Sequence, residues 1–379
     1  MGTDIADLTN NGWPDIYVAD MYPYSESRKK TKMRYETYSE YQQNVKKGFH
    51  HQVTRNTLQL NLGNDSEYHD LPLFSEIGRL SGVEASDWSW AVLLADYDYN
   101  GYTDIYVTNG IYKDLLDQDY IHYMADPNEI RGMIQSDRDD VIMTLMDRIP
   151  SVPQPNFLFS GEGELHFTDS SEAWGLARPG FSSGAAWGDL NGDGSLDMVV
   201  NDVNGPARVY RNQVTELHPE RGRLVLELLG DAPNTRAIGA QLEVWANGSY
   251  WYREHTLQRG FQSSVAPGLH VGLGDDTGRV DSLRLRWPDG RISRMQDIEL
   301  PAQLTLKQSQ SSEPESTIPP SPIITGDLSI ENLRETSSMS SRSSSDGLQS
   351  QKTTSDTSTL PLLEDITNKM GINLSLIHI

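Results

Sequence analysis

Short apolar runs that alternate with clusters of Asn, Asp and Gly recur along the first 213 residues. Ile16–Val18, Ile105–Val107 and Met198–Val200 each follow such a polar cluster, and another apolar run precedes each cluster. Runs of this length that are rich in β-branched residues and bounded by turn formers are typical of β-strands joined by tight loops. The pattern therefore predicts a strand, a loop and a second strand in each of three places.

The three loops belong to a longer repeat. They occupy residues 7–15, 96–104 and 189–197, so their first residues are 89 and 93 positions apart. Similar apolar segments upstream of the second and third loops bring each repeat to about four strands, which is the content of one β-propeller blade. The spacing exceeds the usual ~40 to 50 residues per blade. We assign the surplus to polar or helix-like insertions at about 25–53 and 112–149, on one rim of the propeller.

The pattern changes after the third repeat. Residues 222–306 alternate apolar and polar positions, with turn signals at Asn247-Gly248 and Asp289-Gly290, and predict a small all-β module. Residues 308–359 are dominated by Ser, Thr, Gln, Glu and Pro and contain too few large apolar side chains to form a core. This stretch predicts a disordered linker.

Two short segments follow the linker. Residues 360–373 resemble part of the repeat around Leu73–Ile77 and predict the start of a further repeat. Residues 374–379 look like the translation of a sequencing-library adaptor, and we expect them to be an artefact. Met1 falls inside a predicted strand, so we expect the natural N-terminus to lie upstream.

The charge and the lack of cysteine narrow the function classes. The 379 residues include 31 Lys and Arg against 54 Asp and Glu, which gives a formal net charge of −23 and disfavours a nucleic-acid partner. With 0 cysteines the chain has no disulfide, zinc-thiolate site or thiol nucleophile. It also lacks a membrane-spanning run and a signal peptide. Either the protein is cytoplasmic, or it is extracytoplasmic and its signal peptide was lost with the missing N-terminus; we expect the second.

The nine-residue loops have the composition of a site for a hard cation. Oxygen-bearing side chains stand at positions 1, 3, 5 and 9, and Gly at position 6 allows the chain to reverse. Calcium suits such a loop because it accepts six to eight oxygen ligands in loose geometry. The expected cofactor is therefore Ca²⁺, and the candidate ligands are Asp7, Thr9, Asn11 and Asp15 in the first loop, Asp96, Asp98, Asn100 and Asp104 in the second, and Asp189, Asn191, Asp193 and Asp197 in the third.

The loops differ in their expected affinity. The second and third each supply three carboxylates, whereas the first supplies two, so we expect the first to be the weakest. The alternative is an Asx-rich hairpin that binds no ion. Because all ligands lie within one short loop, we expect a structural rather than a catalytic metal, and we identify no catalytic residues.

The repeats resemble the FG-GAP or VCBS repeats of integrin α-chains and bacterial surface proteins. Residues 222–306 resemble the ASPIC/UnbV domain through Asn234–Leu242, Arg259–Ser263, His270–Gly274 and Trp287–Gly290. The combination is similar in layout to the cartilage acidic protein family. The resemblance implies an exported, calcium-binding propeller without catalytic residues. Thr9 departs from the acidic ligand pattern, and the long insertions depart from the usual blade.

The fold class that follows is all-β, a partial β-propeller with helical or irregular insertions, followed by a small all-β ASPIC/UnbV-like module. We expect a calcium-binding protein of the bacterial exterior that acts in adhesion or ligand binding, with an extracellular protein or glycan as partner. Two alternatives are a polysaccharide-processing or substrate-presenting accessory protein, and a purely structural surface array.

A local concentration of basic residues stands out within this acidic chain. It could bind an acidic glycan or a carboxylated ligand, or form a solvated strand face. Its members are Arg253, His255, Arg259, Arg284, Arg286 and Arg291.

Overall fold

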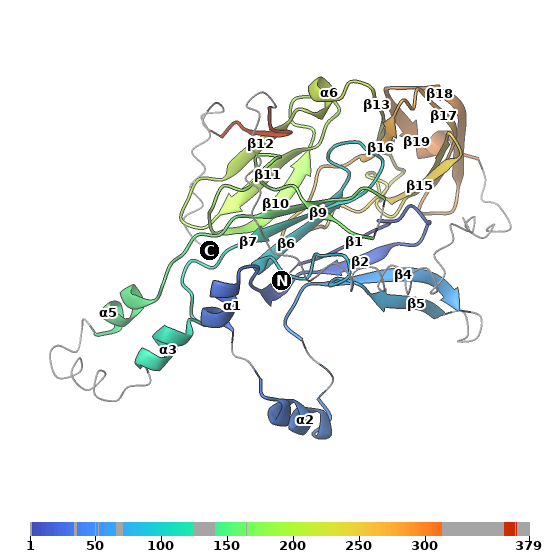
Figure 1. Cartoon of the computed structure of the whole chain (residues 1–379). Coiled ribbons are helices and arrows are strands. Elements are labelled where there is room, and N and C mark those ends of the chain that lie inside the picture. Colours follow the sequence, from blue (N-terminus) through green and yellow to red (C-terminus); the bar gives the residue numbers. More distant parts are fainter. Residues whose placement is uncertain are drawn as a thin grey trace, which may run out of the picture.

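The structure is a computed structural model that describes residues 2–33, 36–49, 51, 53–65, 71–124, 141–163, 165–312, 360–367 and 369. The protein is mostly β, and its sheets are arranged in the manner of propeller blades, three from the repeats and two from the C-terminal module (Figure 1). Among the described residues no helix is both long and apolar enough to cross a membrane. The expected all-β fold class, with a propeller and a module, is confirmed.

Each repeat contributes to one antiparallel blade. In every blade one of the nine-residue loops at 7–15, 96–104 and 189–197, called the metal-type loops below, joins the first two strands of the repeat. The first strands of the three repeats lie side by side, with β6 between β1 and β10. The first blade contains β1 (Thr3–Ala6), β2 (Asp15–Val18), β4 (Thr57–Asp65) and β5 (Leu71–Glu76); the second contains β3 (Met21–Tyr22), β6 (Asp87–Ala95), β7 (Asp104–Asn109), β8 (Phe157–Ser160) and β9 (Thr168–Asp169); the third contains β10 (Ser182–Gly188), β11 (Asp197–Asp202), β12 (Arg208–Asn212) and β20 (Leu363–Asp365).

The second blade is buried on both faces, which explains the unbroken apolar runs of its strands. Side chains alternate across a strand, so neighbouring residues of β6 enter different cores. Val92 and Leu94 pack toward the first blade, whereas Ala91 and Leu93 pack toward the third. All four are buried. Burial on both faces therefore explains why residues 91–94 of β6 are all apolar rather than alternately apolar and polar.

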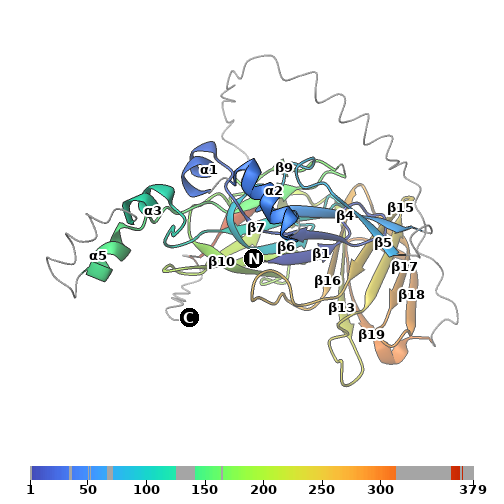
Figure 2. The same cartoon turned by 90° about the horizontal axis from the view of Figure 1, so that it is seen from below.

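Both insertions contain short helices, in agreement with their polar and helix-like sequences. They connect the second strand of a repeat to its third, and their helices lie away from the module in Figure 1. Figure 2 shows the helices of the second insertion on the side opposite the module. Arg28 of the first insertion pairs with Asp87 and lies 3.4 Å from Asp114 of the second, so ion pairs fasten the two insertions together. The helices are α1 (Glu26–Lys32), α2 (Tyr38–Lys46), α3 (Gln118–Met124) and α5 (Val141–Arg148).

The third blade is completed by a strand that lies far along the chain. Residues 360–373 were expected to begin a further repeat, but β20 pairs with β12 through Tyr210 and Asp365 and forms the outer strand of the third sheet. Its sequence resembles that around Leu73–Ile77 because β5 is the outer strand of the first blade. The module is therefore inserted between the third and fourth strands of this blade. Residues 370–379, including the expected artefact, lie outside the described residues.

The module consists of two sheets packed around one core. One sheet has the order β16-β13-β19, with β13 and β19 parallel, and the other has the order β15-β14-β17-β18. Trp287 and Leu283 are among the buried side chains between them. A short helix, α6 (Val214–Leu217), leads into β13 (Arg221–Leu229), β14 (Gln241–Ala246), β15 (Ser249–Glu254), β16 (Leu269–Asp275), β17 (Arg279–Arg286), β18 (Ile292–Glu299) and β19 (Ala302–Lys307).

The start of the expected linker belongs to the module. Residues 308–310 form a 3₁₀ helix, and Gln308 is buried. The Gln308 side chain accepts a hydrogen bond from the Asp231 backbone, and Ser312 bridges to Ile292. Composition favoured disorder here, but hydrogen bonds to the module satisfy these polar groups. Residues 313–359 lie outside the described residues.

Replacing Leu363 tests the assignment of β20 to the third blade. Leu363 is fully buried and packs in the core shared with the second blade. We expect Leu363→Ala to lower the free energy of unfolding by about 2 kcal/mol, near the lower end for buried leucine because an outer strand can relax. Urea unfolding measures this. The control is Leu360→Ala, since Leu360 is 66% exposed. Equal stability of the two variants would mean that β20 does not belong to this blade.

Candidate metal centre

The three nine-residue loops form one continuous row at the same end of the blades. The Asn10 side chain donates to the Gly101 carbonyl at 2.8 Å, and the Thr103 hydroxyl donates to the Asp7 carbonyl at 3.1 Å. The Tyr99 hydroxyl donates to the Gly194 carbonyl and so joins the second loop to the third. Each loop is therefore held by its neighbour as well as by its own strands.

The same hydrogen bonds recur inside each loop. The first aspartate accepts from the backbone of the glycine at position 6, and this glycine has a positive φ that favours residues without Cβ. The last aspartate accepts from the backbone N–H at position 2 and from a second backbone N–H, which lies on the third strand of the repeat or directly after it. The glycine bonds are Gly12 to Asp7 at 2.8 Å, Gly101 to Asp96 at 3.0 Å and Gly194 to Asp189 at 2.9 Å; the closing bonds run from Leu8 and Asn61 to Asp15, from Tyr97 and Gly161 to Asp104, and from Leu190 and Asn212 to Asp197.

The second loop gathers three carboxylates. Oxygen atoms of Asp96, Asp98 and Asp104 all lie within 4.8 Å of one another, and this is the only such acidic group found among the described residues. Burial, followed by the charge of Asp98, raises the pKa of Asp96 well above its usual value. Burial and then the charges of Asp98 and Asp96 raise the pKa of Asp104 in the same way. Three acids in so small a space repel one another unless a cation or protons compensate them.

The composition of the second loop fits a hard cation. Asp96 Oδ1 is buried and accepts no hydrogen bond within the described part of the chain. All three side chains offer oxygen, which Ca²⁺ prefers. Asn100, the fourth expected ligand, is engaged otherwise, because its Oδ1 accepts from Tyr102 at 2.7 Å and its Nδ2 donates to Gly161 at 2.8 Å.

The first loop contains two aspartates and one buried hydroxyl group without a hydrogen-bond partner in the described structure. This hydroxyl is Thr9 Oγ1. Burial raises the pKa of Asp7, and it raises the pKa of Asp15 to about 7. Asn11 Oδ1 accepts from the Trp13 backbone at 2.7 Å. This loop offers fewer carboxylates than the second, as its sequence predicts.

The third loop uses its acids for internal hydrogen bonds. Asp193 accepts from the Ser195 backbone at 2.8 Å and from the Asn191 side chain at 2.7 Å. Both oxygens of Asp189 accept from backbone groups, of Gly192 and Gly194. The sequence placed this loop on a par with the second, but its three carboxylates do not converge in the described structure.

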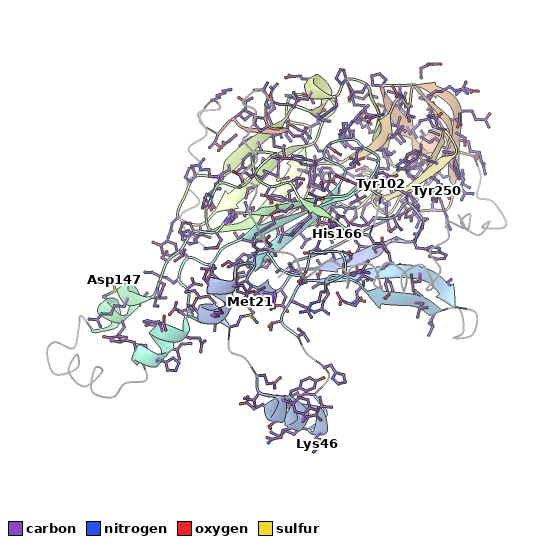
Figure 3. All side chains as sticks on the ribbon, in the orientation of Figure 1. Met21, Lys46, Tyr102, Asp147, His166 and Tyr250 are labelled. Carbon is purple, nitrogen blue, oxygen red and sulfur yellow. The ribbon has the colours of Figure 1, made fainter. Side chains whose placement is uncertain are left out.

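The module covers the loops, which the sequence alone did not indicate. The Trp251 indole donates to the Gly101 carbonyl at 2.8 Å, and the Gly274 backbone donates to the Tyr99 carbonyl at 3.1 Å. Arg221 lies 2.9 Å from the Asp98 carboxylate. Figure 3 places Tyr102 of the second loop near the junction with the module, whereas Lys46 and Asp147 lie on the distant insertions. No local pattern marks Trp251 or Arg221 as neighbours of a loop more than a hundred residues away.

Five of the six residues in the basic concentration of the module fall into two groups, and Arg286 belongs to neither. Arg284 pairs with Glu243, and Arg291 pairs with Asp231 and Asp289, so these arginines serve the module itself. Arg253, His255 and Arg259 instead line the junction with the loops.

Comparison with known proteins locates the module within a family. Residues 230–313 match the family model described as ASPIC and UnbV, and they overlap residues 222–306 expected from the sequence. Cartilage acidic protein 1 from Homo sapiens is 39% identical over 62 residues, which are 16% of this chain and 9% of that protein. The protein of the same name from Mus musculus is 40% identical over 57 residues, 15% of this chain and 9% of that protein. The similarity to these curated relatives thus spans less than a tenth of their length.

Proposed function

We propose that this chain is a calcium-binding, extracytoplasmic propeller protein that acts in adhesion or ligand binding and performs no catalysis. The observation that carries the proposal is the convergence of Asp96, Asp98 and Asp104, with one oxygen of Asp96 lacking a partner in the described structure. The propeller with an ASPIC/UnbV segment supports a non-catalytic surface or ligand-binding protein.

Calcium is the cation that this chemistry favours. The site offers oxygen atoms only, and extracellular calcium modules typically bind with dissociation constants of ~10⁻⁴ to 10⁻³ M. Such a site fills outside the cell and stays largely empty in cytoplasm. When bound, the ion would neutralise the buried carboxylates of the second loop, and Asp96, Asp98 and Asp104 would hold it.

The metal would then act on the module as well as on its own loop. Trp251, Gly274 and Arg221 all contact residues 98–101 of the second loop. Because these contacts use backbone carbonyls and one carboxylate, they require the loop to keep one shape. A bound ion would therefore stabilise the platform on which the module rests.

The helical insertions are the part of the described surface best suited to a partner. They expose large apolar side chains, which soluble proteins usually bury unless a partner covers them. Examples are Tyr38 at 78% exposure, Phe49 at 58%, Leu115 at 57% and Met143 at 56%. We infer that an extracellular protein or glycan binds this end while calcium holds the opposite end.

A binding screen tests the partner proposal. We expect the 379-residue chain to bind a subset of immobilised glycans or extracellular matrix proteins in calcium. Leu115→Ser should reduce binding about tenfold, because the loss of one interface anchor commonly costs 1 to 2 kcal/mol. Leu229→Ser, which changes a 41% exposed leucine of the module, serves as the control. Turnover of a glycan, peptide or ester by the purified chain would contradict the proposal, as would equal loss of binding in both variants.

A further inference from the structure

A cavity lies at the junction of the propeller loops and the module. It has a volume of about 60 Å³ and is lined by Leu94 and Trp187 from the blades and by Arg253, His255 and Arg259 from the module. Ile5 also lines it and is 47% exposed, so the cavity reaches the surface. The metal-type loops contribute Asp7 and Asp96 to its wall.

Unmet hydrogen-bonding capacity is concentrated around this cavity. Buried polar atoms without a partner are rare in folded proteins, and each requires an explanation. Within the described structure, several residues of the cavity wall carry such an atom: Asp96 Oδ1, Trp187 Nε1, Arg253 Nη2, His255 Nε2 and Arg259 Nε. Their gathering in one place points to a bound group that the protein itself does not supply.

Most of these atoms are hydrogen-bond donors. The indole nitrogen of Trp187 and the guanidinium nitrogens of Arg253 and Arg259 can only donate, and the ring nitrogen of His255 can do either. His255 is 2% exposed, and the Arg259 side chain is 9% exposed. The missing partner is therefore an acceptor with several oxygen atoms.

Arg259 and Arg253 differ in whether a carboxylate compensates their positive charge. Arg259 Nη1 donates to both oxygens of Asp4, at 2.8 and 3.0 Å, so its charge is compensated. Arg253 Nη1 donates to the Tyr252 carbonyl at 2.8 Å, and no carboxylate lies within salt-bridge distance of Arg253 among the described residues. An arginine in a protein stays charged. Arg253 thus brings a positive charge to the cavity without a paired anion.

The acids in the wall do not supply that anion directly. Both oxygens of Asp7 accept backbone hydrogen bonds, from Asn11 and Gly12, and Asp96 belongs to the proposed calcium ligands. This step rests on the proposed function, because calcium at the loops would offset the charges of Asp7 and Asp96. The positive charge of Arg253 would then dominate the cavity, apart from the exposed Glu254 at its wall.

We propose that the cavity binds one small oxyanion, the carboxylate or sulfate group of an acidic ligand. A water molecule needs roughly 10 to 15 Å³ of such a cavity. The space therefore accommodates about four to six water-sized positions, which suits a carboxylate or sulfate group. A guanidinium presents its N–H groups in a fork that matches two oxygens of an oxyanion.

Titration of the 379-residue chain with simple anions tests the site. In calcium, we expect sodium sulfate or sodium acetate to produce saturable, one-to-one heat by calorimetry that sodium chloride of equal ionic strength does not. Arg253→Gln should weaken the binding at least tenfold because it removes the unpaired charge. Arg286→Gln neutralises an arginine of the module outside the cavity and should change the binding less than twofold. Tighter binding of sulfate than of acetate would identify a sulfated ligand, and the reverse order would identify a carboxylated one.

Separate readouts keep the outcomes distinct. Calcium heat without saturable anion binding would overturn the oxyanion site and leave the calcium proposal intact. Anion binding that is unchanged in Arg253→Gln would also overturn the site. If Arg253→Gln does not fold, crystals of the unmodified chain soaked in selenate decide the matter: an anomalous peak beside Arg253 supports the site, and a cavity that contains only water refutes it. If titration with calcium produces no heat of binding, the calcium proposal is overturned. The anion titration, repeated in a chelator, would still show whether the cavity binds an oxyanion.

Discussion

In a chelator, we expect Asp96→Asn to unfold at a higher temperature than the unmodified chain, and in about 10 mM calcium at a lower one. Asparagine keeps the oxygen that accepts from Gly101 and removes a charge from the group formed with Asp98 and Asp104. Without metal, that charge is buried and repelled, as the raised pKa of Asp96 indicates. With metal, the same charge is a ligand. A reversal of sign with calcium is therefore the signature of a metal site.

The size of the effect follows from the binding equilibrium. A ligand at 100 times its dissociation constant stabilises the folded state by ~2.7 kcal/mol per site. Differential scanning calorimetry should show this as a calcium-dependent rise in melting temperature that Asp96→Asn largely loses. Asp169→Asn is a matched control, because Asp169 accepts a hydrogen bond from Ser171 in the same blade but lies outside the loops. Melting temperatures that do not respond to calcium would leave the Asx-rich hairpin without an ion as the explanation.

The pH dependence of stability in the presence of a chelator provides a second test of calcium binding at the loops. Burial raises the pKa of Asp15 to about 7 from 3.8, so between these values the folded state holds more protons than the unfolded state. The free energy of unfolding must then fall as pH rises through this window. Calcium needs ionised carboxylates and should flatten or reverse the slope. Urea unfolding between pH 4 and about 7.5, with and without calcium, measures both slopes.

Arg259→Gln should lower the free energy of unfolding by about 3 to 5 kcal/mol, the largest loss that we expect from one substitution. The side chains of Arg259 and Asp4 are 9% and 4% exposed, and the pair joins the module to β1. Asp4 also accepts from the Leu94 backbone at 2.8 Å, so it lies where the first and second blades meet. Removing the arginine leaves a buried carboxylate without its compensating charge.

A double variant separates this explanation from a simple loss of packing. Asp4→Asn with Arg259→Gln removes both charges, so its loss of stability should be smaller than the sum of the two single losses. Arg279→Gln is the control, since Arg279 is 53% exposed and pairs with exposed acids; it should cost less than ~1 kcal/mol. Chemical denaturation measures all four variants. A strictly additive double variant would rule out a coupled ion pair.

The position of the module explains why a metal in the propeller would concern a second domain. In an antiparallel blade, the connection between strands one and two and the connection between strands three and four lie at the same end. In the third blade the module is the connection between the third and fourth strands, β12 and β20. The metal-type loops connect the first and second strands of their blades. The strand order of the third blade therefore places the module at the same end as the loops.

Local sequence determined the strands, the repeated loops and the module of this protein. Alternation of apolar and polar residues and turn formers such as Gly12 and Gly101 act between near neighbours, so they are legible in the chain itself. The unbroken run Ala91–Ala95 likewise indicated a strand, but that both of its faces are buried came from the structure.

Only the tertiary structure decided which distant residues meet. The partner of β20, the convergence of three carboxylates in the second loop rather than the third, and the contact between Trp251 and Gly101 all depend on how complete elements pack. The contact between Trp251 and Gly101 joins residues 150 positions apart, and such contacts leave no periodic trace in the sequence. The cavity beside Arg253 arises for the same reason, since its walls come from the blades and the module together.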